Sequence, residues 1–501
     1  MTTTNENDNV TVATVAADVA NSSNDSQSNF TINTPELSAS CCTKSQQELQ
    51  QQKQQQQPRV VRRRRRNQAK DDAIVIDPKL LETAMKESNL PSAYSFEITK
   101  TVQRILQLNA RHVALQMPEG LLLYASVLAD VLKRLVAATC RKISTNDTVP
   151  TDVSSLQVSI LGDVTYGACC VDDLGAQALG CDLLVHYGHS CLVPIQHTAI
   201  PCLYVFVEIT IDVDHLIECF QLTMQEQIRQ NGNCNDASLL PHVYLLGTIQ
   251  FRHALSQAKT MLQEKGYDVS IPQAKPLSPG EVLGCTSPVL ATTTAESTSD
   301  GHHVNALVLF VADGRFHLES TLISNPQIPL FLRYDPYSKT MTEESYQHDQ
   351  MHTIRRAAIR KAQNGKVFGI ILGTLGRQGN PAILHRLQTL LRAHDKRSFV
   401  MLASEITPSK LALFGSKVDA WVQIACPRLS VDWGHHLSPT TPVLNPYELF
   451  VCLGETEFQE RYPMDYYASA GGPWRSFCGR NNNDIVILEL LYTIERMNNT
   501  F

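Results

Sequence analysis

Short, mostly apolar runs recur along this chain and alternate with longer stretches in which apolar residues are three or four positions apart. The first group of runs covers residues 113–116, 158–161, 183–186 and 203–207. Largely apolar runs of four or five residues are typical of strands buried on both faces, as in parallel sheets, and the spaced stretches are typical of helices. The pattern therefore predicts repeated strand–helix units.

Two further series follow the first. The second has a helical stretch over 213–230 and strands at 243–246 and 306–310. The third has strands at 329–333, 367–372, 399–403 and 420–424, with helices near 351–362 and over 381–393. Polar turns follow the strands in each series, which predicts an α/β fold of three similar domains with parallel-type sheets around a shared centre. The predicted domains span residues 73–208, 209–322 and 323–475.

The two ends of the chain carry a weaker pattern. Residues 1–72 are rich in Thr, Asn, Ser and Gln and lack apolar periodicity, which predicts a disordered tail. Within this tail, residues 62–66 are all arginine, which is typical of a nuclear-localisation signal or of a patch that docks an acidic or RNA-bearing partner. A solvated charge is the simpler interpretation. Residues 476–501 form a C-terminal tail in which we expect one last helix at 485–497.

Composition narrows the class of protein. The chain has 501 residues, of which 43% are hydrophobic, so it can bury a large core. It has no apolar run long enough to cross a membrane and no apolar signal core near residue 1. Its 14 cysteines are not spaced like those of secreted proteins, and its net charge is −6. We therefore expect a cytoplasmic protein with free thiols or metal ligands that does not bind membranes or nucleic acid directly.

Three cysteines stand in turns beside the predicted strands, one in each series. Cys169 lies between the strand at 158–161 and a helix that we expect to end at Gly180, and Cys285 and Cys426 lie in similar turns. No CxxC spacing is present, so spacing alone favours buried thiols. If the three turns converge, however, three thiolates leave one iron of a cubane cluster open.

A zinc site is the alternative reading of these cysteines. A closed zinc site takes four ligands, and the fourth would be His189 or Cys191. The neighbouring Ser190 does not make a hydrolase site, because the G-x-S-x-G motif is absent and adjacent side chains point apart in an extended chain. A hydrogen-bonded pocket wall is the simpler interpretation of this stretch.

A glycine-rich loop follows the strand at 367–372 and precedes a helix. It contains Gly373, Thr374, Leu375, Gly376, Arg377 and Gln378. Backbone amides in such a loop can hold an anion, and its place after a strand favours a small-molecule contact. The loop is neither GxGxxG nor a phosphate loop ending in GK[ST], which disfavours a dehydrogenase or a nucleotide-dependent ligase. A tight structural turn remains an equal alternative.

Charged residues also stand at strand ends. Arg315, Arg333 and Arg428 follow or end predicted strands. An arginine fork can hold a carboxylate of a small molecule, and it can equally form an ion pair between domains. The sequence leaves both interpretations open.

Several of these stretches together resemble one family. They cover residues 116–120, 162–173, 187–192, 276–288, 313–317, 373–379 and 426–434. In this order they are similar to the 2-(3-amino-3-carboxypropyl)histidine synthases of diphthamide biosynthesis, and the resemblance extends over residues 75–475. All three cysteine motifs are intact, as in one of the two subunits of the eukaryotic heterodimer. The chain departs from the family pattern at Leu174 and Gly175, where an aromatic and a polar residue are expected.

The resemblance implies a specific chemistry. In this family a [4Fe-4S] cluster is held by one cysteine from each of three domains, matched here by Cys169, Cys285 and Cys426, with Cys170 as a neighbour. The open iron binds S-adenosylmethionine, and one electron breaks the Cγ–S bond of this co-substrate in an unusual radical reaction. Methylthioadenosine is left, and the 3-amino-3-carboxypropyl group is transferred to a histidine carbon of elongation factor 2. The loop from Gly373 to Gln378 is our candidate for part of the S-adenosylmethionine pocket.

The resemblance also implies partners. Family members act as a heterodimer with a homologous second subunit and receive electrons from a small iron protein fed by a reductase. Elongation factor 2 is the protein substrate. A non-catalytic partner subunit, in which a cluster or zinc only stabilises the domains, is the alternative function.

Overall fold

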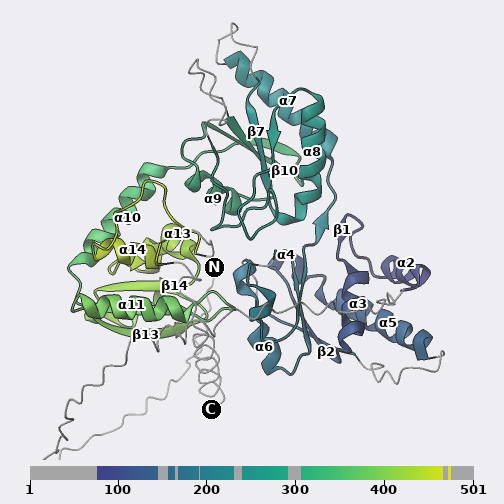
Figure 1. Cartoon of the computed structure of the whole chain (residues 1–501), viewed down its shortest axis with the longest axis horizontal. Helices are drawn as coiled ribbons and strands as arrows, with labels where there is room; N and C mark the ends of the chain where they lie inside the picture. The colour runs from purple at the N-terminus through teal and green to yellow at the C-terminus, as the bar shows by residue number, and fades with distance from the viewer. Residues whose placement is uncertain are drawn as a thin grey trace, which may run out of the picture. The chain divides into compact units, whose positions relative to one another are not determined.

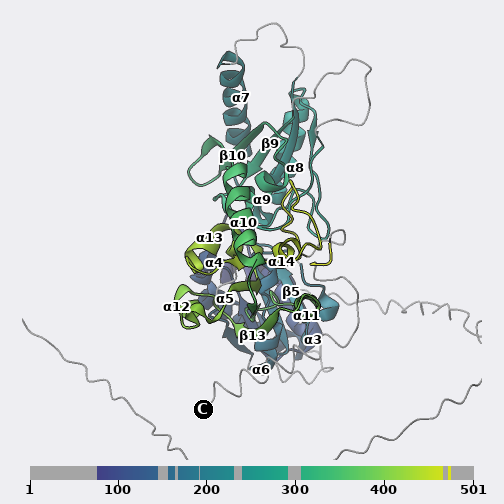
Figure 2. The same ribbon diagram turned by 90° about the vertical axis from the view of Figure 1, so that its left-hand side faces the viewer.

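We describe a computed structural model of the chain. The structure describes residues 76–144, 156–163, 167–190, 192–230, 240–291, 306–466 and 472–474, all of which belong to one compact unit, residues 73–501. The predicted tail at 1–72 and the predicted helix at 485–497 lie outside the described residues, as does Cys191. Each of the three large sheets is built from one continuous part of the chain. In Figures 1 and 2 the first is purple to blue, the second is teal and the third is green.

The first sheet has four parallel strands. Their order is β3-β2-β4-β5, with bounds β2 (His112–Gln116), β3 (Gln157–Ile160), β4 (Leu183–Tyr187) and β5 (Cys202–Val205). One face packs against α2 (Pro78–Glu87), α3 (Ile98–Leu108) and α5 (Ala125–Ser144), and the other against α6 (Asp173–Ala178). Short elements complete this region: β1 (Tyr94–Ser95) paired with β6 (Glu208–Ile209), and α4 (Glu119–Leu122).

The second sheet has five strands in the order β11-β10-β9-β7-β8. Their bounds are β7 (His242–Gly247), β8 (Val269–Ser270), β9 (Ala306–Val311), β10 (Leu330–Asp335) and β11 (Thr340–Glu343). All neighbours are parallel except β11, which is antiparallel to β10. The helices α7 (Val213–Gln230) and α8 (Arg252–Glu264) cover one face, and α9 (Phe316–Ser324) covers the other (Figure 1).

The third sheet has four parallel strands in the order β13-β12-β14-β15. Their bounds are β12 (Val367–Gly373), β13 (Arg397–Ala403), β14 (Ala420–Ile424) and β15 (Val443–Leu444). One face packs against α10 (His348–Gln363), α11 (Pro381–Ala393) and α14 (Pro446–Cys452), and the other against α12 (Pro408–Ala412) and α13 (Pro427–Leu437).

The predicted α/β class with parallel-type sheets is confirmed, but one strand was assigned to the wrong series. The strand predicted at 329–333 as the start of the third domain is β10, which pairs with β9. The predicted boundary between residues 322 and 323 therefore cuts through the second sheet. Periodicity shows that a strand forms but not which strand it pairs with, because pairing partners are distant in sequence.

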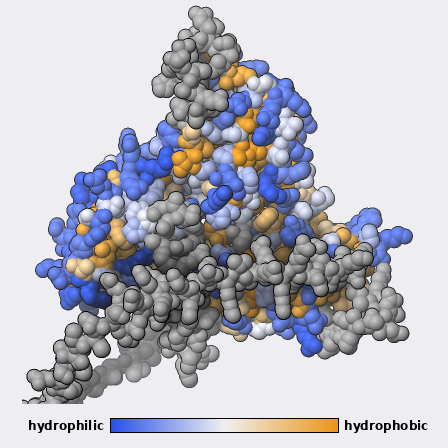
Figure 3. Space-filling view, in the orientation of Figure 1, coloured by the Kyte–Doolittle hydropathy of each residue, from blue (hydrophilic) through white to orange (hydrophobic). Residues whose placement is uncertain are grey.

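The surface of the molecule is mostly polar, as expected when apolar side chains are packed between sheets and helices. On the face that Figure 3 shows, most of the coloured surface is hydrophilic, and apolar residues occur in smaller patches. Among the helices that the structure describes, none combines the length and the apolar composition that a membrane span needs.

A buried ion pair holds α10 and α14 together behind the third sheet. The guanidinium of Arg355 contacts Glu448 through two hydrogen bonds of 2.6 Å, and both side chains are at most 2% exposed. Arg355 also donates to the backbone oxygens of Ser430 and Val443, each at 2.8 Å. All of these partners are needed because an unpaired charge in such a place is strongly destabilising.

We expect Glu448→Gln to lower the free energy of unfolding by about 3–5 kcal/mol, since it leaves the Arg355 charge buried without a counter-charge. Chemical denaturation followed by circular dichroism measures this change. Glu82→Gln, which breaks an exposed pair with Lys86, is the control and should change the free energy by less than about 0.5 kcal/mol. Equal losses in the two variants would contradict the assigned role of the buried pair.

Candidate functional site

The turn that carries Cys169 is a short 3-10 helix, Ala168–Cys170, placed between β3 and α6. Asp172 caps α6, and its side chain accepts a hydrogen bond from the amide of Gly175 at 2.8 Å. A Cβ at position 175 would lie 2.1 Å from the Asp172 carboxylate. The departure from the family pattern at Gly175 thus fits the cap of this helix.

The last residue of β2, Gln116, contacts this turn through its side chain. The side-chain amide of Gln116 donates to the carbonyl of Cys170 at 2.8 Å, and its oxygen accepts from the amide of Asp172 at 3.1 Å. The same oxygen lies 2.9 Å from Nδ1 of His186 on β4. The hydrogen bonds of Gln116 to Cys170 and His186 are buried, and they connect the turn to two strands of the first sheet.

The glycine-rich loop after β12 packs directly on the Cys169 turn. The amide of Arg377 donates to the carbonyl of Cys169 at 2.9 Å, and the side-chain amide of Gln378 donates to Sγ of Cys170 at 3.2 Å. Gly376 has a φ of 56°, and a Cβ there would lie 2.4 Å from the carbonyl group of Cys170. Glycine is therefore required at 376 both by the backbone conformation and by the close approach.

Arg377 forms an ion pair that connects this loop to the first sheet. Its Nε and Nη2 atoms contact the two carboxylate oxygens of Asp173 at 2.8 and 2.6 Å. Asp173 is fully buried and also accepts a hydrogen bond from the amide of Ala199. A bidentate pair of this kind is strong and directional, so the guanidinium serves to join the loop to α6.

Cys285 follows a stretch that joins the carboxyl edge of the second sheet through a bridge between Gly247 and Glu281. Its Sγ lies 3.7 Å from Oγ1 of Thr286. The side chain also packs against the apolar core of the third sheet. Cys285 thus stands where the second sheet meets the third.

Cys426 is the N-cap residue of α13, directly after β14, and Arg428 lies in the first turn of the same helix. The guanidinium of Arg428 donates to the carbonyls of Phe316 and Gly284 at 2.8 and 3.2 Å and pairs with Asp432 at 2.7 Å. It lies over the Phe316 ring, 4.5 Å from the ring centroid. Because Gly284 precedes Cys285, one arginine connects the Cys426 turn with the Cys285 turn.

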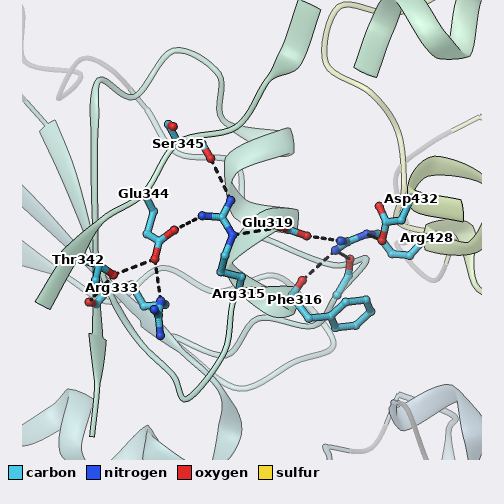
Figure 4. A network of polar contacts seen from close by, with 10 residues as sticks. Arg315, Phe316, Glu319, Arg333, Thr342, Glu344, Ser345, Arg428 and Asp432 are labelled. Atoms are coloured by element: carbon cyan, nitrogen blue, oxygen red, sulfur yellow. Dashed lines mark hydrogen bonds and ion pairs between the residues drawn. The ribbon is translucent and has the colours of Figure 1, made fainter. Parts of the chain in front are cut away.

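Figure 4 shows that this contact belongs to a longer network. Glu319 pairs with Arg428 and with Arg315, and Arg315 also pairs with Glu344. Glu344 accepts a second hydrogen bond from Arg333 at 2.8 Å. Burial raises the pKa of Glu344, but its hydrogen bonds with Arg333 and Thr342 outweigh this effect and hold the pKa below its ordinary value. Of the two interpretations left open for these arginines, the structure shows ion pairs.

The three thiols influence one another electrostatically. A hydrogen bond with Cys170 and burial raise the pKa of Cys169, and negative charge on Cys426 and Cys285 raises it further. Burial, followed by the charge of Cys426, raises the pKa of Cys285, and burial raises that of Cys426 to about 11. Burial and the neighbouring thiols therefore oppose ionisation of these cysteines, and a bound metal would favour the thiolate forms.

This donor set fits an iron–sulfur cluster. Within the part of the chain that the structure describes, no three His, Cys, Asp or Glu side chains converge on a single ion. A cubane cluster does not require such convergence, because each thiolate binds a different iron. His189, the candidate fourth zinc ligand, lines a separate cavity together with His317.

A cavity of about 620 Å³ opens beside Cys426. The loop contributes Gly373, Leu375 and Gln378 to its wall. Thr374 is held by its amide, which donates to the carbonyl of Ala403 at 3.0 Å. Most of the remaining wall comes from the segment after β13 and from α13, and includes Glu405, Thr407, Asp432 and Trp433, and Gly162 and Phe316 also line the cavity. The predicted loop therefore serves both as a cavity wall and as the contact that holds the Cys169 turn.

Comparison with known proteins identifies the family. A model of diphthamide synthesis proteins matches residues 117–463, which is well over half of the chain. The chain belongs to the diphthamide synthesis family. The resemblance predicted from the sequence motifs is thereby confirmed.

Relatives within this family have closely similar sequences. The chain is 50% identical over 387 residues to 2-(3-amino-3-carboxypropyl)histidine synthase subunit 1 of Gallus gallus, covering 77% of this chain and 83% of the relative. It is 47% identical over 405 residues to the protein of the same name from Homo sapiens, covering 80% and 82%. Both relatives are named as a subunit of a histidine synthase, which confirms the predicted enzyme class.

Solved structures of the diphthamide synthesis family share the fold. The crystal structure of Dph2 from Pyrococcus horikoshii with a 4Fe-4S cluster is 26% identical and has a TM-score of 0.54, with 74% of this chain and 94% of that chain covered. A second crystal structure of the same archaeal protein has the same identity and TM-score. An iron–sulfur cluster thus occurs in a structural relative of this chain.

Two features of the site were not predicted from the sequence. Gln116 lies in a recognised motif, but nothing in its surroundings indicates that it holds the carbonyl of Cys170. Arg377 was interpreted as part of an anion-binding loop, whereas its guanidinium pairs with Asp173. The role of Arg377 is indicated by its contact with Asp173, and this contact is visible only in the folded structure.

We expect Gly376→Ala to lower the free energy of unfolding by about 1–3 kcal/mol more than Gly415→Ala does. Both glycines have a positive φ, but the space around a Cβ at 415 is empty within 4 Å, so the control variant carries only the conformational strain, about 1–2 kcal/mol. Denaturation curves measure the difference, and alkylation mapped by mass spectrometry should show faster labelling of Cys169 in Gly376→Ala. Indistinguishable behaviour of the two variants would mean that the loop does not hold the cysteine turn.

Proposed function

We propose that this chain is the cluster-bearing subunit of an enzyme that carries out the first step of diphthamide formation. It transfers a 3-amino-3-carboxypropyl group from S-adenosylmethionine to a histidine of elongation factor 2. The observation that carries the proposal is that the third sheet contacts the turns of both other cysteines. The loop after β12 donates to the carbonyl of Cys169, and Arg428, two residues after Cys426, donates to the carbonyl of Gly284 beside Cys285. Cys426 itself lines a cavity. In this proposal the three sheets form three domains around a central [4Fe-4S] cluster.

The three cysteines would hold three of the four irons, and the fourth iron is left for S-adenosylmethionine. When bound, the cluster supplies the electron that breaks the Cγ–S bond of S-adenosylmethionine, with methylthioadenosine as the nucleoside product. The residues of the chain keep the thiols in position: Gln116 and the loop hold Cys169, and Arg428 holds the backbone beside Cys285. Fixed positions matter because small misplacements of reacting groups lower the rate strongly.

The cavity of about 620 Å³ is our candidate site for S-adenosylmethionine. Trp433 is 58% exposed and offers an aromatic face for the adenine ring. Glu405, Asp432 and the hydroxyl of Thr407 provide acceptors for the ribose and for the positive charges of the ligand. The backbone at Gly373 and Leu375 completes the wall nearest the Cys169 turn.

The partners proposed for this chain follow from the same family. Its relatives are named subunit 1, which supports an assembly of more than one subunit. We propose that the second subunit is a homologue, that a small iron protein with its reductase delivers electrons, and that the reaction takes place in the cytoplasm.

Product analysis tests the proposed reaction. The chain is purified without oxygen together with its homologous partner, reduced with dithionite and mixed with S-adenosylmethionine, and the nucleoside is identified by chromatography. We expect methylthioadenosine. Formation of 5′-deoxyadenosine would show that a different bond breaks, and absence of both product and bound iron would favour the non-catalytic partner subunit.

Substitution of the cysteines tests their individual roles. Cys169→Ala, Cys285→Ala and Cys426→Ala should each abolish methylthioadenosine formation and lower the bound iron, because each removes a cluster ligand. Cys170→Ala is the matched neighbour and should retain part of the activity and the iron. Equal activity and iron content in all four variants would contradict the assignment of the ligands.

A further inference from the structure

A second cavity, of about 250 Å³, lies between the ends of strands in the first and second sheets. Its wall includes Gly120 on α4, His189 after β4, Thr248 after β7 and His317 on α9. It shares no lining residue with the larger cavity beside Cys426. The neighbouring residues Phe316 and His317 line the larger and the smaller cavity, respectively.

Two polar atoms in the wall of the smaller cavity have no hydrogen-bond partner among the described residues. They are Nδ1 of His189 and Oγ1 of Thr248, on side chains that are 8% and 4% exposed. Leaving a buried polar atom unpaired is unfavourable, so native proteins rarely do so without a ligand or water to complete the bond. A ligand or an ordered water in this cavity would complete the two bonds.

The two histidines of this wall are neutral near pH 7, and Asp313 adds a carboxyl group to the wall. Burial lowers the pKa of His189 to about 4, although a hydrogen bond with the backbone of Tyr187 acts in the opposite direction. Burial, together with the charges of His189 and Arg428, lowers the pKa of His317 to about 3. A neutral imidazole offers one donor and one acceptor, and a second neutral imidazole is complementary to it. The rings of Tyr94, Phe206 and Tyr337 provide apolar surface for a flat side chain.

The smaller cavity also lies next to the cysteine turns. Leu283 lines the cavity and packs with Leu192 and Leu277 in a cluster that Cys169 contacts. The same Leu283 stands two residues before Cys285. Leu283 is therefore shared by the wall of the smaller cavity and by the cluster that contacts Cys169.

We propose that the smaller cavity receives the imidazole of the histidine that is modified in the protein substrate, and that His189, Thr248 and His317 orient this ring. The proposal rests on the proposed function, since it places the acceptor of the same reaction. The volumes agree with this division, because the larger cavity is suited to a nucleoside co-substrate and the smaller one to a single side chain.

Two glycines allow each cavity to be filled separately. Gly120 lines the smaller cavity and Gly162 the larger one, and a Cβ built at either position meets no atom within 4 Å. Gly314 has the same free space but lines neither cavity. Gly120→Leu, Gly162→Leu and Gly314→Leu therefore form a matched set, to be prepared as the full chain with its homologous subunit and reconstituted without oxygen.

The test measures binding and transfer apart. We expect Gly120→Leu to raise the KM and the Kd for elongation factor 2 about tenfold or more, with the Kd for S-adenosylmethionine changed less than about twofold. Gly162→Leu should do the reverse, and Gly314→Leu should resemble the unchanged protein. Weaker binding of S-adenosylmethionine in Gly120→Leu, with elongation factor 2 unaffected, would overturn the proposal by assigning the cavity to the co-substrate. Identical behaviour of Gly120→Leu and Gly314→Leu would overturn it as well.

Thr248→Val provides a second test that hardly changes the volume of the side chain. If the hydroxyl binds the acceptor, transfer to elongation factor 2 should fall about three- to tenfold while thermal stability is retained, since no protein hydrogen bond is lost. Unchanged transfer would overturn the role of Thr248. The affinity for elongation factor 2 is measured without turnover, so it does not depend on the reaction. Failure of the unchanged protein to form methylthioadenosine would contradict the proposed function. The binding results would still decide whether the smaller cavity receives the histidine.

Discussion

The ion pair between Arg377 and Asp173 is the contact on which the rest of the site depends. Its carboxylate is fully buried, and a buried charge is tolerated only where its partner has good geometry. The pair therefore restricts where the loop after β12 can lie relative to α6. With the loop so placed, its backbone amide reaches the carbonyl of Cys169, and Gly376 reaches Cys170 at a distance that no larger residue permits.

The third sheet makes an equivalent contact with the second. Arg428 stands two residues after Cys426 and donates to the carbonyl of Gly284, the residue before Cys285. A displacement of α13 would therefore move Cys426 and disturb the Cys285 turn at the same time. The two arginines differ from exposed ion pairs in that both are nearly inaccessible to water, so salt screens them little.

Local elements were predictable from the sequence, and their assembly was not. The helices at 213–230 and 381–393 and the strand at 420–424 were predicted with the bounds that the structure shows, because each is defined by the spacing of its own apolar residues. The strand at 329–333 was recognised but placed in the wrong sheet, since its partner β9 precedes it by a helix that periodicity cannot assign to a layer.

The same distinction explains the predictions for the site. The turns of Cys169, Cys285 and Cys426 were found because cysteine beside a strand end is a visible pattern and because the family motifs include them. The role of Arg377 was missed since Asp173 lies 204 positions away in the chain. The smaller cavity was not predicted either, because its wall combines residues from two sheets and its unpaired atoms become apparent only in three dimensions.

Each sheet is built from a continuous part of the chain. This arrangement sets the order in which the sheets can fold during synthesis. The ribosome releases the first and second sheets, with Cys169 and Cys285, before the segment that contains Cys426, Arg377 and Arg428 has been synthesised. Both inter-sheet ion pairs and the third thiol therefore arrive last. If the three cysteines hold a cluster as proposed, the set of ligands is complete only after the third sheet has folded. Capture of the cluster would then be a late event, and the two earlier thiols would stay open to oxidation until that point.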